Sequence, residues 1–319
     1  MIDARGLARA FNTKQGRVEA VCGVDLLVEP GEIVGFLGPN GAGKTTTLRM
    51  LTTLLQPTAG SATVVGCDLL ADPQGVRERI GYVSQVGGTD PSCPVGEELI
   101  LQGELHGLSR VEAKRRAEGL YDDLDLRAIA TRPAGSLSGG QRRRLDIALG
   151  LVHRPPLLFL DEPSTGLDPQ SRSHLWDLVR RLRSDLKTTV FLTTHYLDEA
   201  DALADRLLII DHGRIVAEGT PDALKRRISG DVVTLEIRGD VERARQAIVG
   251  HPGVRDVTGS GSTLRLTVDH GERALVELVR LLDETGATLV SVNLSRPTLD
   301  DVFLTVTGRS LREDAAPAA

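Results

Sequence analysis

A glycine-rich turn directly after an apolar strand constrains this chain more than any other feature. The apolar run Ile33 to Leu37 is typical of a buried strand, and the turn that follows it has the sequence GPNGAGKTT. This turn fits the pattern G-x-x-x-x-G-K-[ST], in which glycines let backbone N–H groups curl around phosphate oxygens at a helix N-terminus. The order strand, phosphate loop, helix predicts a layered α/β domain that binds a nucleotide. The structural alternative is a glycine-rich turn without a ligand.

The side chains of this turn specify the ligand further. Lys44 is its only charged residue, and we expect its ammonium group to reach the β- and γ-phosphates of ATP. Thr45 supplies a hydroxyl that can ligate Mg²⁺. The turn therefore predicts a nucleoside triphosphate with Mg²⁺, and ATP is what the family resemblance given below implies. The predicted nucleotide contacts are Gly38, Pro39, Asn40, Gly41, Ala42, Gly43, Lys44, Thr45 and Thr46.

Two adjacent acids, Asp161 and Glu162, follow the apolar strand predicted at 157–160. Parallel α/β sheets place their ligand sites at the carboxyl ends of strands. Adjacent carboxylates at the end of a buried strand are costly without a cation or a donor nearby, so a nucleotide and Mg²⁺ explain them better than a solvated strand end does. We expect Asp161 to join the Mg²⁺ shell and Glu162 to polarise the attacking water as general base.

A second glycine-rich turn, LSGGQ at 137–141, precedes a basic helical segment. A helix N-terminus of this kind also suits a phosphate. The chain has only one loop of the GPNGAGKTT type, so the phosphate bound at the second turn must come from another copy of the protein. The sequence therefore predicts a homodimer that sandwiches ATP between two chains.

Two domains are predicted, and the first covers residues 1–227. Short β-rich runs alternate there with amphipathic stretches, as in an α/β domain. Strands are expected at 33–37, 157–160 and 189–192, and helices over 111–126. A last pair of strands around 206–215 turns at Asp211, His212 and Gly213.

The second predicted domain covers residues 228–310 and is a small α+β unit. Strands at 232–237, 254–257, 263–268 and 288–292 and helices at 241–249 and 272–285 give the order βαββαβ, which indicates a ferredoxin-like fold. A final helix follows Pro297, with Thr298 as N-cap and Leu299, Phe303 and Val306 on one face. That face packs either on the sheet of its own domain or on a second subunit or permease. The tail 311–319 is expected to be disordered.

The order of the motifs resembles that of the ATP-binding-cassette (ABC) family. In chain order they are GPNGAGKT, YVSQ at 82–85, LSGGQ, LLFLDEP, STGLD at 164–168 and TTH at 193–195. The resemblance extends over the whole first domain. It implies an ABC-type ATP hydrolase with a mixed sheet core and a helical subdomain.

The resemblance also implies roles for single residues. Gln85 would couple Mg²⁺ and water to the surface that meets a membrane subunit, and His195 would contact the γ-phosphate beside Glu162. With Lys44, these residues form the implied catalytic set. Phe11 aligns with the aromatic residue that stacks on adenine, although a lone Phe is usually a core residue. The signature residues Ser138, Gly139, Gly140 and Gln141 would bind the partner's ATP, and Asp168 would bridge the two subunits.

A narrower resemblance is to ATP-binding subunits of the daunorubicin-resistance type. It is carried by the segment 38–66, by the run from LSGGQ to STGLDP, and by PTLDDVF at 297–303. It implies a separate integral-membrane permease of the ABC-2 class, which binds a drug, antibiotic or other amphipathic molecule, and a location on the cytoplasmic face of the membrane. The segment VGGTDPSCPVGEEL after Gln85 departs from the usual run, and this segment should face the permease.

Composition narrows the alternatives. The net charge of -6 argues against a partner bound through phosphate neutralisation, so we expect no nucleic acid. No window has the roughly 20 uncharged apolar residues of a membrane span, and the first residues do not resemble a secretory signal. The rival hypothesis is a non-transport ABC ATPase acting on DNA or the ribosome. Such proteins carry long insertions or two cassettes, and neither is present in this sequence.

Overall fold

The structure is a computed structural model that describes residues 1–319 except 15, 229, 260, 270, 296 and 309–319. The chain divides into two compact units, one from Met1 to Pro221 and one that begins at Asp222. The structure divides the chain at the start of the short helix α8 (Pro221–Ile228), whereas the boundary was predicted after residue 227, at the end of this helix. The predicted disordered tail falls outside the described residues. None of the described helices is both long and apolar enough to cross a membrane.

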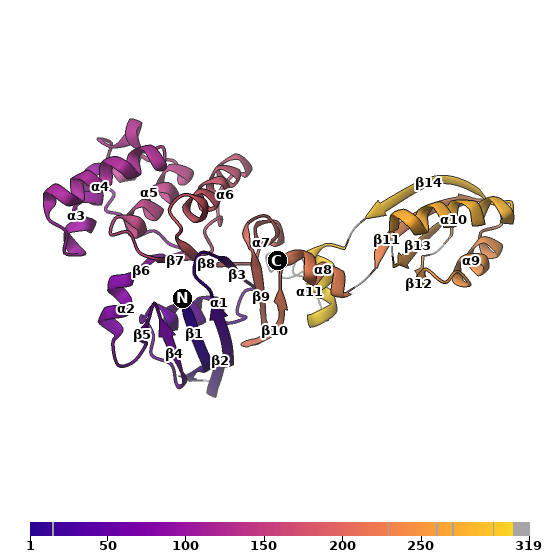
Figure 1. The fold of residues 1–319 in the computed structure, drawn as a ribbon, viewed down its shortest axis with the longest axis horizontal. Helices are drawn as coiled ribbons and strands as arrows, with labels where there is room; N and C mark the ends of the chain where they lie inside the picture. Colours follow the sequence, from indigo (N-terminus) through magenta and orange to yellow (C-terminus); the bar gives the residue numbers. More distant parts are fainter. Residues whose placement is uncertain (15, 229, 260, 270, 296, 309–319) are drawn as a thin grey trace. The chain divides into compact units, whose positions relative to one another are not determined.

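A six-stranded mixed sheet forms the centre of the first unit (Figure 1). Its order is β10-β9-β3-β8-β7-β6, and all neighbours run parallel except β10 and β9. Strands β3, β7 and β8 are buried along their whole length, which explains their nearly continuous apolar sequences. Their carboxyl ends meet at one edge. The strands are β3 (Ile33–Leu37), β6 (Ile80–Val83), β7 (Leu157–Asp161), β8 (Thr189–Thr194), β9 (Arg206–Asp211) and β10 (Arg214–Gly219).

An antiparallel sheet of order β2-β1-β4-β5 covers one side of this core. Its strands are β1 (Ile2–Thr13), β2 (Gly16–Val28), β4 (Ala59–Val64) and β5 (Cys67–Asp68). Phe36, Phe159 and Phe191 from the central sheet pack in the same apolar cluster as residues of β1, β2 and helix α1 (Lys44–Leu51). This cluster fixes the start of α1 at the end of β3. Helix α2 (Pro73–Arg79) follows β5 and leads into β6.

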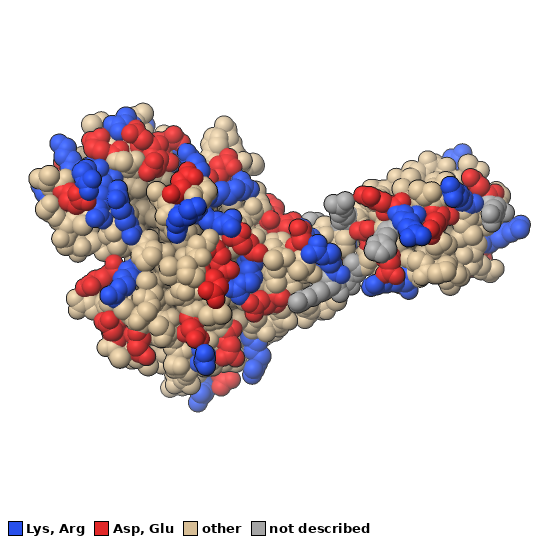
Figure 2. Space-filling view, in the orientation of Figure 1, with Lys and Arg blue, Asp and Glu red and all other residues tan. Residues whose placement is uncertain are grey.

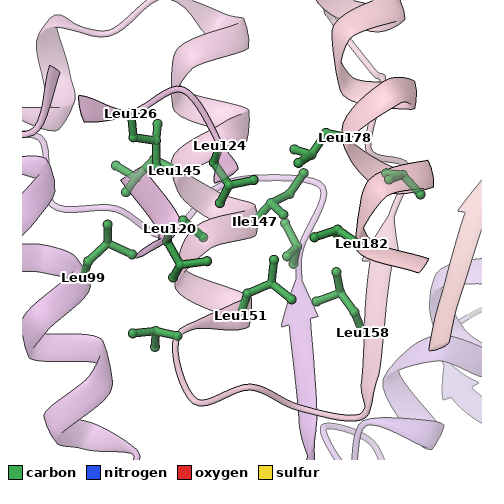
Figure 3. Close-up of a cluster of buried hydrophobic side chains, with 14 of the residues drawn as sticks. Leu99, Leu120, Leu124, Leu126, Leu145, Ile147, Leu151, Leu158, Leu178 and Leu182 are labelled. Atoms are coloured by element: carbon green, nitrogen blue, oxygen red, sulfur yellow. The ribbon is translucent and has the colours of Figure 1, made fainter. Parts of the chain in front are cut away.

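Helices cover the other side of the central sheet. They are α3 (Val95–Leu105), α4 (Arg110–Asp123), α5 (Gly139–Leu151), α6 (Pro169–Ser184) and α7 (Leu197–Leu203), with short 3₁₀ turns at Arg127–Ile129 and Ala134–Ser136. Figure 3 shows leucines of α3, α4, α5 and α6 meeting beside β7 in one cluster. Of the stretch 111–126, where helices were predicted, residues up to Asp123 belong to α4 and the rest form a loop. The predicted mixed sheet with a helical subdomain is confirmed.

The second unit contains the predicted βαββαβ order. Its antiparallel sheet has the order β12-β13-β11-β14, so β13 lies between the two strands joined through α9. Both helices pack on one face of the sheet (Figure 1). This is the ferredoxin-like arrangement. The elements are β11 (Asp231–Arg238), α9 (Val241–Val249), β12 (Val254–Thr258), β13 (Thr263–Val268), α10 (Gly271–Thr285) and β14 (Thr288–Ser295).

The final helix, α11 (Leu299–Thr307), begins where the sequence predicts. Thr298 caps it, because its hydroxyl oxygen accepts a hydrogen bond from the Asp301 N–H at 3.4 Å. Leu299 and Phe303 are buried, and Val306 is half-buried. Among the described residues, the apolar cluster between the sheet and helices α9 and α10 contains none of these side chains. The alternative in which α11 packs on the sheet of its own domain is therefore not what the structure shows.

Candidate functional site

The phosphate loop connects β3 to α1 and has little room for side chains. Gly41 and Gly43 have φ of +80° and +106°, a backbone conformation that strongly favours glycine. A Cβ on Gly38 would lie 2.3 Å from the Ile210 carbonyl oxygen, and one on Gly43 would lie 2.5 Å from the Ala20 carbonyl oxygen. Close packing against β9 and β2 therefore requires glycine at both ends of the loop.

Lys44 is almost fully buried, with 4% of its surface exposed. Its Nζ donates to the carbonyl oxygens of Gly38 at 2.7 Å and Pro39 at 3.0 Å. The same Nζ lies 3.2 Å from Glu162 Oε1. Burial lowers the pKa of Lys44, and the charge of Glu162 opposes this effect. The ammonium group therefore lies between the phosphate loop and the acid at the end of β7.

Asp161 receives hydrogen bonds from two hydroxyl groups. Thr193 Oγ1 donates to Asp161 Oδ1 at 2.6 Å, and Thr45 Oγ1 donates to the same oxygen at 3.1 Å. Asp161 and Thr193 are directly paired neighbours on the parallel strands β7 and β8. The sheet thus brings the predicted metal ligands Thr45 and Asp161 together. A hydroxyl and a carboxylate oxygen are hard donors of the kind that Mg²⁺ accepts.

Glu162 lies at the centre of the predicted catalytic residues. Its Oε2 accepts a hydrogen bond from Gln85 Nε2 at 3.1 Å and from Thr165 Oγ1 at 3.3 Å, and it lies 3.2 Å from His195 Nδ1. Burial alone would raise the pKa of Glu162, but the adjacent His195 imidazole and the charge of Lys44 lower it to about 2. Gln85, Lys44, Glu162 and His195 therefore form one contiguous group in the folded chain.

The backbone of Glu162 is held in an unusual conformation. Its φ is +43°, which is uncommon for a residue with a side chain. The N–H of Glu162 lies 3.1 Å from the Thr193 carbonyl oxygen and 3.0 Å from Thr193 Oγ1. These contacts with the neighbouring strand hold the turn that aims the carboxylate at Lys44.

The signature turn forms the N-terminus of α5. Ser138 Oγ accepts a hydrogen bond from the Gln141 N–H at 3.3 Å, and Gln141 Oε1 accepts one from the Ser138 N–H at 3.1 Å. This capping box occupies two backbone donors, the N–H groups of Ser138 and Gln141, and Gly139 is exposed. A Cβ on Gly140 would lie 2.7 Å from Ser171 Oγ, so α5 and α6 approach closely at this point.

Asp168 caps the neighbouring helix α6. Its Oδ1 accepts from the Ser171 N–H at 2.9 Å and its Oδ2 accepts from Ser171 Oγ at 2.6 Å. Within the part of the chain that the structure describes, no hydrogen bond or ion pair connects the signature turn 138–141 with the phosphate loop 38–46. The fold of one chain therefore does not join these two predicted phosphate sites.

Comparisons with known proteins agree with this geometry. The sequence profile of the ABC transporter family matches residues 21–165, and that of the C-terminal domain of DrrA1-3-like ATP-binding proteins matches residues 219–307. The daunorubicin/doxorubicin resistance ATP-binding protein DrrA of Streptomyces peucetius is 45% identical over 313 residues, which cover 96% of this chain and 92% of the relative. The chain belongs to the ABC transporter ATP-binding proteins.

Two further similarities support the same family. The doxorubicin resistance ATP-binding protein DrrA of Mycobacterium tuberculosis is 43% identical over 300 residues, which cover 92% of this chain and 90% of the relative. A solved dimeric ABC cassette in a post-hydrolysis state, bound to ADP and phosphate, has a TM-score of 0.63 and 25% identity, and the match covers 69% of this chain and 98% of that one. This ABC protein is an ATP hydrolase. Nothing favours the alternative of a non-transport ATPase acting on DNA or the ribosome.

Two residues that hold this ABC site together, Thr193 and Arg143, carry no signal of that role in the sequence. Thr193 lies within the TTH motif, but only the pairing of β8 with β7 reveals its contacts to Asp161 and Glu162. Arg143 lies in the basic run 142–144 and is buried. Its guanidinium donates to the carbonyl oxygens of Asp161 at 3.1 Å, Pro163 at 2.9 Å and Ser84 at 2.7 Å. In a single sequence, nothing distinguishes a buried arginine of a basic run from its exposed neighbours.

Phe11 lies on β1 and is half-buried. The guanidinium carbon of Arg9 lies 4.7 Å from the centroid of its ring. Phe11 is therefore neither fully in the core nor free of contacts, and its stacking on adenine stays a prediction.

Proposed function

We propose that two copies of this chain close on two ATP molecules and so drive a separate ABC-2 class permease that exports a drug, antibiotic or other amphipathic molecule. In each composite site the phosphate loop 38–46 comes from one chain and the signature residues Ser138, Gly139, Gly140 and Gln141 come from the other. Asp168 joins the subunit contact. The observation that carries this proposal is the group that Lys44, Gln85 and His195 form around Glu162. These four residues come from α1, the loop after β6, and the ends of β7 and β8.

Within this site we assign Glu162 the role of general base. With Lys44 3.2 Å away, the pKa of about 2 makes the carboxylate a weak base. Lys44 would leave Glu162 when it binds the phosphates of ATP, and the loss of this cation raises the pKa of Glu162. Gln85 and His195 keep the carboxylate oriented meanwhile. In this role the Glu162 carboxylate accepts a proton from the attacking water.

Mg²⁺ belongs to the same proposal. The residues that would hold it are Thr45, Asp161 and Gln85, which present a hydroxyl, a carboxylate and an amide oxygen. The described residues contain no cluster of three or more His, Cys, Asp or Glu side chains that could hold a metal on their own. This fits an ion bound partly through substrate phosphates. When bound, Mg²⁺ would neutralise charge on the transferred phosphoryl group.

The membrane partner and the export substrate are inferred from the relatives. The DrrA proteins of S. peucetius and M. tuberculosis carry names that refer to daunorubicin and doxorubicin resistance. We infer that this chain also acts in export, peripherally on the cytoplasmic face of the membrane, with a permease that binds the substrate. No nucleic acid is part of this proposal.

The test is ATP hydrolysis and export in proteoliposomes that contain the permease and this chain. Glu162→Gln should abolish hydrolysis and export while retaining an ATP-dependent dimer, since it removes the base and keeps the phosphate contacts. Asp201→Asn, a change of an exposed acid on α7, is the matched control. Continued hydrolysis by Glu162→Gln would show that another group is the base. A drug gradient in the absence of this chain would exclude it as the motor.

A further inference from the structure

A buried glutamate, Glu199, lies on helix α7 outside the group around Glu162. Acidic and basic side chains are interspersed over the visible surface of the first unit (Figure 2), whereas Glu199 has 0% of its surface exposed. Its Oε1 accepts a hydrogen bond from Ser164 Oγ, and Ser164 Oγ accepts one from Trp176 Nε1 at 3.2 Å. The three side chains come from α7, from the turn after β7 and from α6. They therefore form a short chain of hydrogen bonds inside the domain.

The charge of Glu199 is only partly compensated. Burial raises its pKa, while hydrogen bonds with three neighbouring side chains and the charge of Arg172 oppose this effect. The three neighbours are Ser164, Thr194 and Trp176. The Oε2 atom is buried and has no hydrogen-bond partner among the described residues. A buried acid of this kind adds little stability compared with an apolar side chain. What it provides is a fixed arrangement, because few positions of the neighbouring segments satisfy its donors.

Ser164 lies in the turn that carries Glu162. This turn runs to Thr165, whose N–H donates to the Glu162 carbonyl oxygen at 3.2 Å and whose Oγ1 donates to Glu162 Oε2 at 3.3 Å. Ser164 is fully buried, and its hydroxyl connects the turn to α7. Glu162 has a φ of +43°, a conformation that a residue with a side chain keeps only where surrounding contacts hold it. Glu199 is therefore an anchor of this turn.

Glu199 also belongs to the segment that carries His195. Helix α7 begins at Leu197, two residues after His195, and Glu199 lies in its first turn. His195 Nδ1 lies 3.2 Å from Glu162 Oε2, the same oxygen that Thr165 contacts. The two side chains at this oxygen thus come from segments that Glu199 joins. A shift of one segment against the other would move the Glu162 carboxylate.

We propose that Glu199 is a positioning residue, which keeps the Glu162 carboxylate aligned for hydrolysis by holding Ser164 against α7. It acts through the turn 162–165 and not by contact with the nucleotide. The inference rests on the proposed function, because it takes Glu162 as the group that accepts the proton. A displacement of about 1 Å at a reacting group can cost roughly 100-fold in rate. ATP binding depends on the phosphate loop 38–46, so loss of Glu199 should lower turnover and leave affinity unchanged.

The test is ATP hydrolysis by the full chain with its permease in proteoliposomes, measured as kcat and KM. Glu199→Met substitutes an unbranched apolar side chain of similar length and removes the acceptor for Ser164. Its kcat should fall about 10- to 100-fold, while its KM for ATP stays within about threefold of the wild type. Glu199→Gln keeps an acceptor oxygen and should retain kcat within about threefold, because a neutral acceptor preserves most of the hydrogen bond.

Leu203→Ala is the matched control for a merely structural role. Leu203 is a buried apolar residue at the end of the same helix and belongs to the cluster beside β7. Its truncation should lower the urea midpoint but leave the bond between Ser164 and Glu199 in place, so kcat should stay close to that of the wild type. A fall in kcat as large as that of Glu199→Met would overturn the inference, because loosening of α7 would then account for both.

Ser164→Ala removes the donor from the other side, and it decides the question if Glu199→Met does not fold. Its kcat should fall by a similar factor, and the double variant should be no slower than either single variant, because both changes remove the same contact. A wild-type kcat in Ser164→Ala or Glu199→Met, or losses that multiply in the double variant, would overturn the positioning role. Wild-type hydrolysis by Glu162→Gln would instead sink the proposed base, so the two failures are distinguishable.

Discussion

Replacing Gly140 by alanine should lower the free energy of unfolding, whereas replacing its neighbour Gly139 at the start of α5 should not. A Cβ on Gly140 would lie 2.7 Å from Ser171 Oγ and 3.0 Å from Ser171 Cβ, distances at which one group must move. Ser171 cannot turn away freely, because its hydroxyl donates to Asp168 Oδ2 at 2.6 Å. A Cβ on Gly139 would have its nearest neighbour, Leu167 Cδ2, at 3.8 Å, which is ordinary contact.

These distances set the expected magnitudes. Overpacking at Gly140→Ala should cost about 1–3 kcal/mol of unfolding free energy. Gly139→Ala should be neutral or stabilising by up to about 1 kcal/mol, because alanine restricts the unfolded chain more than glycine does. For a denaturant slope of ~3 kcal/mol/M, a loss of ~2 kcal/mol lowers the urea midpoint by roughly 0.7 M.

The assay is urea unfolding followed by the fluorescence of Trp176, the single tryptophan, which lies on the same helix α6 as Ser171. In a double-mutant cycle, Ser171→Ala should recover part of the loss in the Gly140→Ala background, since it removes the closest atom. An unchanged midpoint for Gly140→Ala, or an equal loss in Gly139→Ala, would refute the reasoning from close packing of α5 on α6.

Three further predictions test other parts of the structure. Mixing Ser138→Arg with Lys44→Ala should recover ATP hydrolysis through one intact composite site per heterodimer, and no recovery at any ratio would mean that each chain works alone. Phe303→Ala removes a ring that is 0% exposed and should cost about 3–5 kcal/mol, whereas Leu304→Ala, on the exposed side of α11, should cost little. ATP affinity, measured by calorimetry, should stay unchanged in both variants. In the folded chain, burial lowers the pKa of His153 from an ordinary 6.5 to about 4. Between these two pH values the unfolded chain binds a proton on His153 that the folded chain does not. Stability therefore falls as the pH drops from about 6.5 towards 4. Urea midpoints across this range should fall less steeply in His153→Gln.

The sequence alone determined the parts of this protein whose signals are local. The turn GPNGAGKTT, the acids after an apolar strand and the glycine-rich turn LSGGQ are each contained in a short window, because turn geometry depends on neighbouring residues. The βαββαβ order of the second unit was predictable for the same reason, since strands and helices differ in hydrophobic period. The ends of strands were predicted less well, because β14 continues to Ser295 whereas the predicted strand ended at residue 292.

Only the tertiary structure decided which distant segments meet. Thr193 holds Asp161 because β8 pairs with β7, and strand order depends on packing across the whole sheet. The burial of Phe303 outside the cluster of its own sheet was equally out of reach of the sequence. Asp146 appears in the sequence as an ordinary helical acid. Its burial is visible only once the fold is assembled, because burial is a property of the packed layers and not of any one segment.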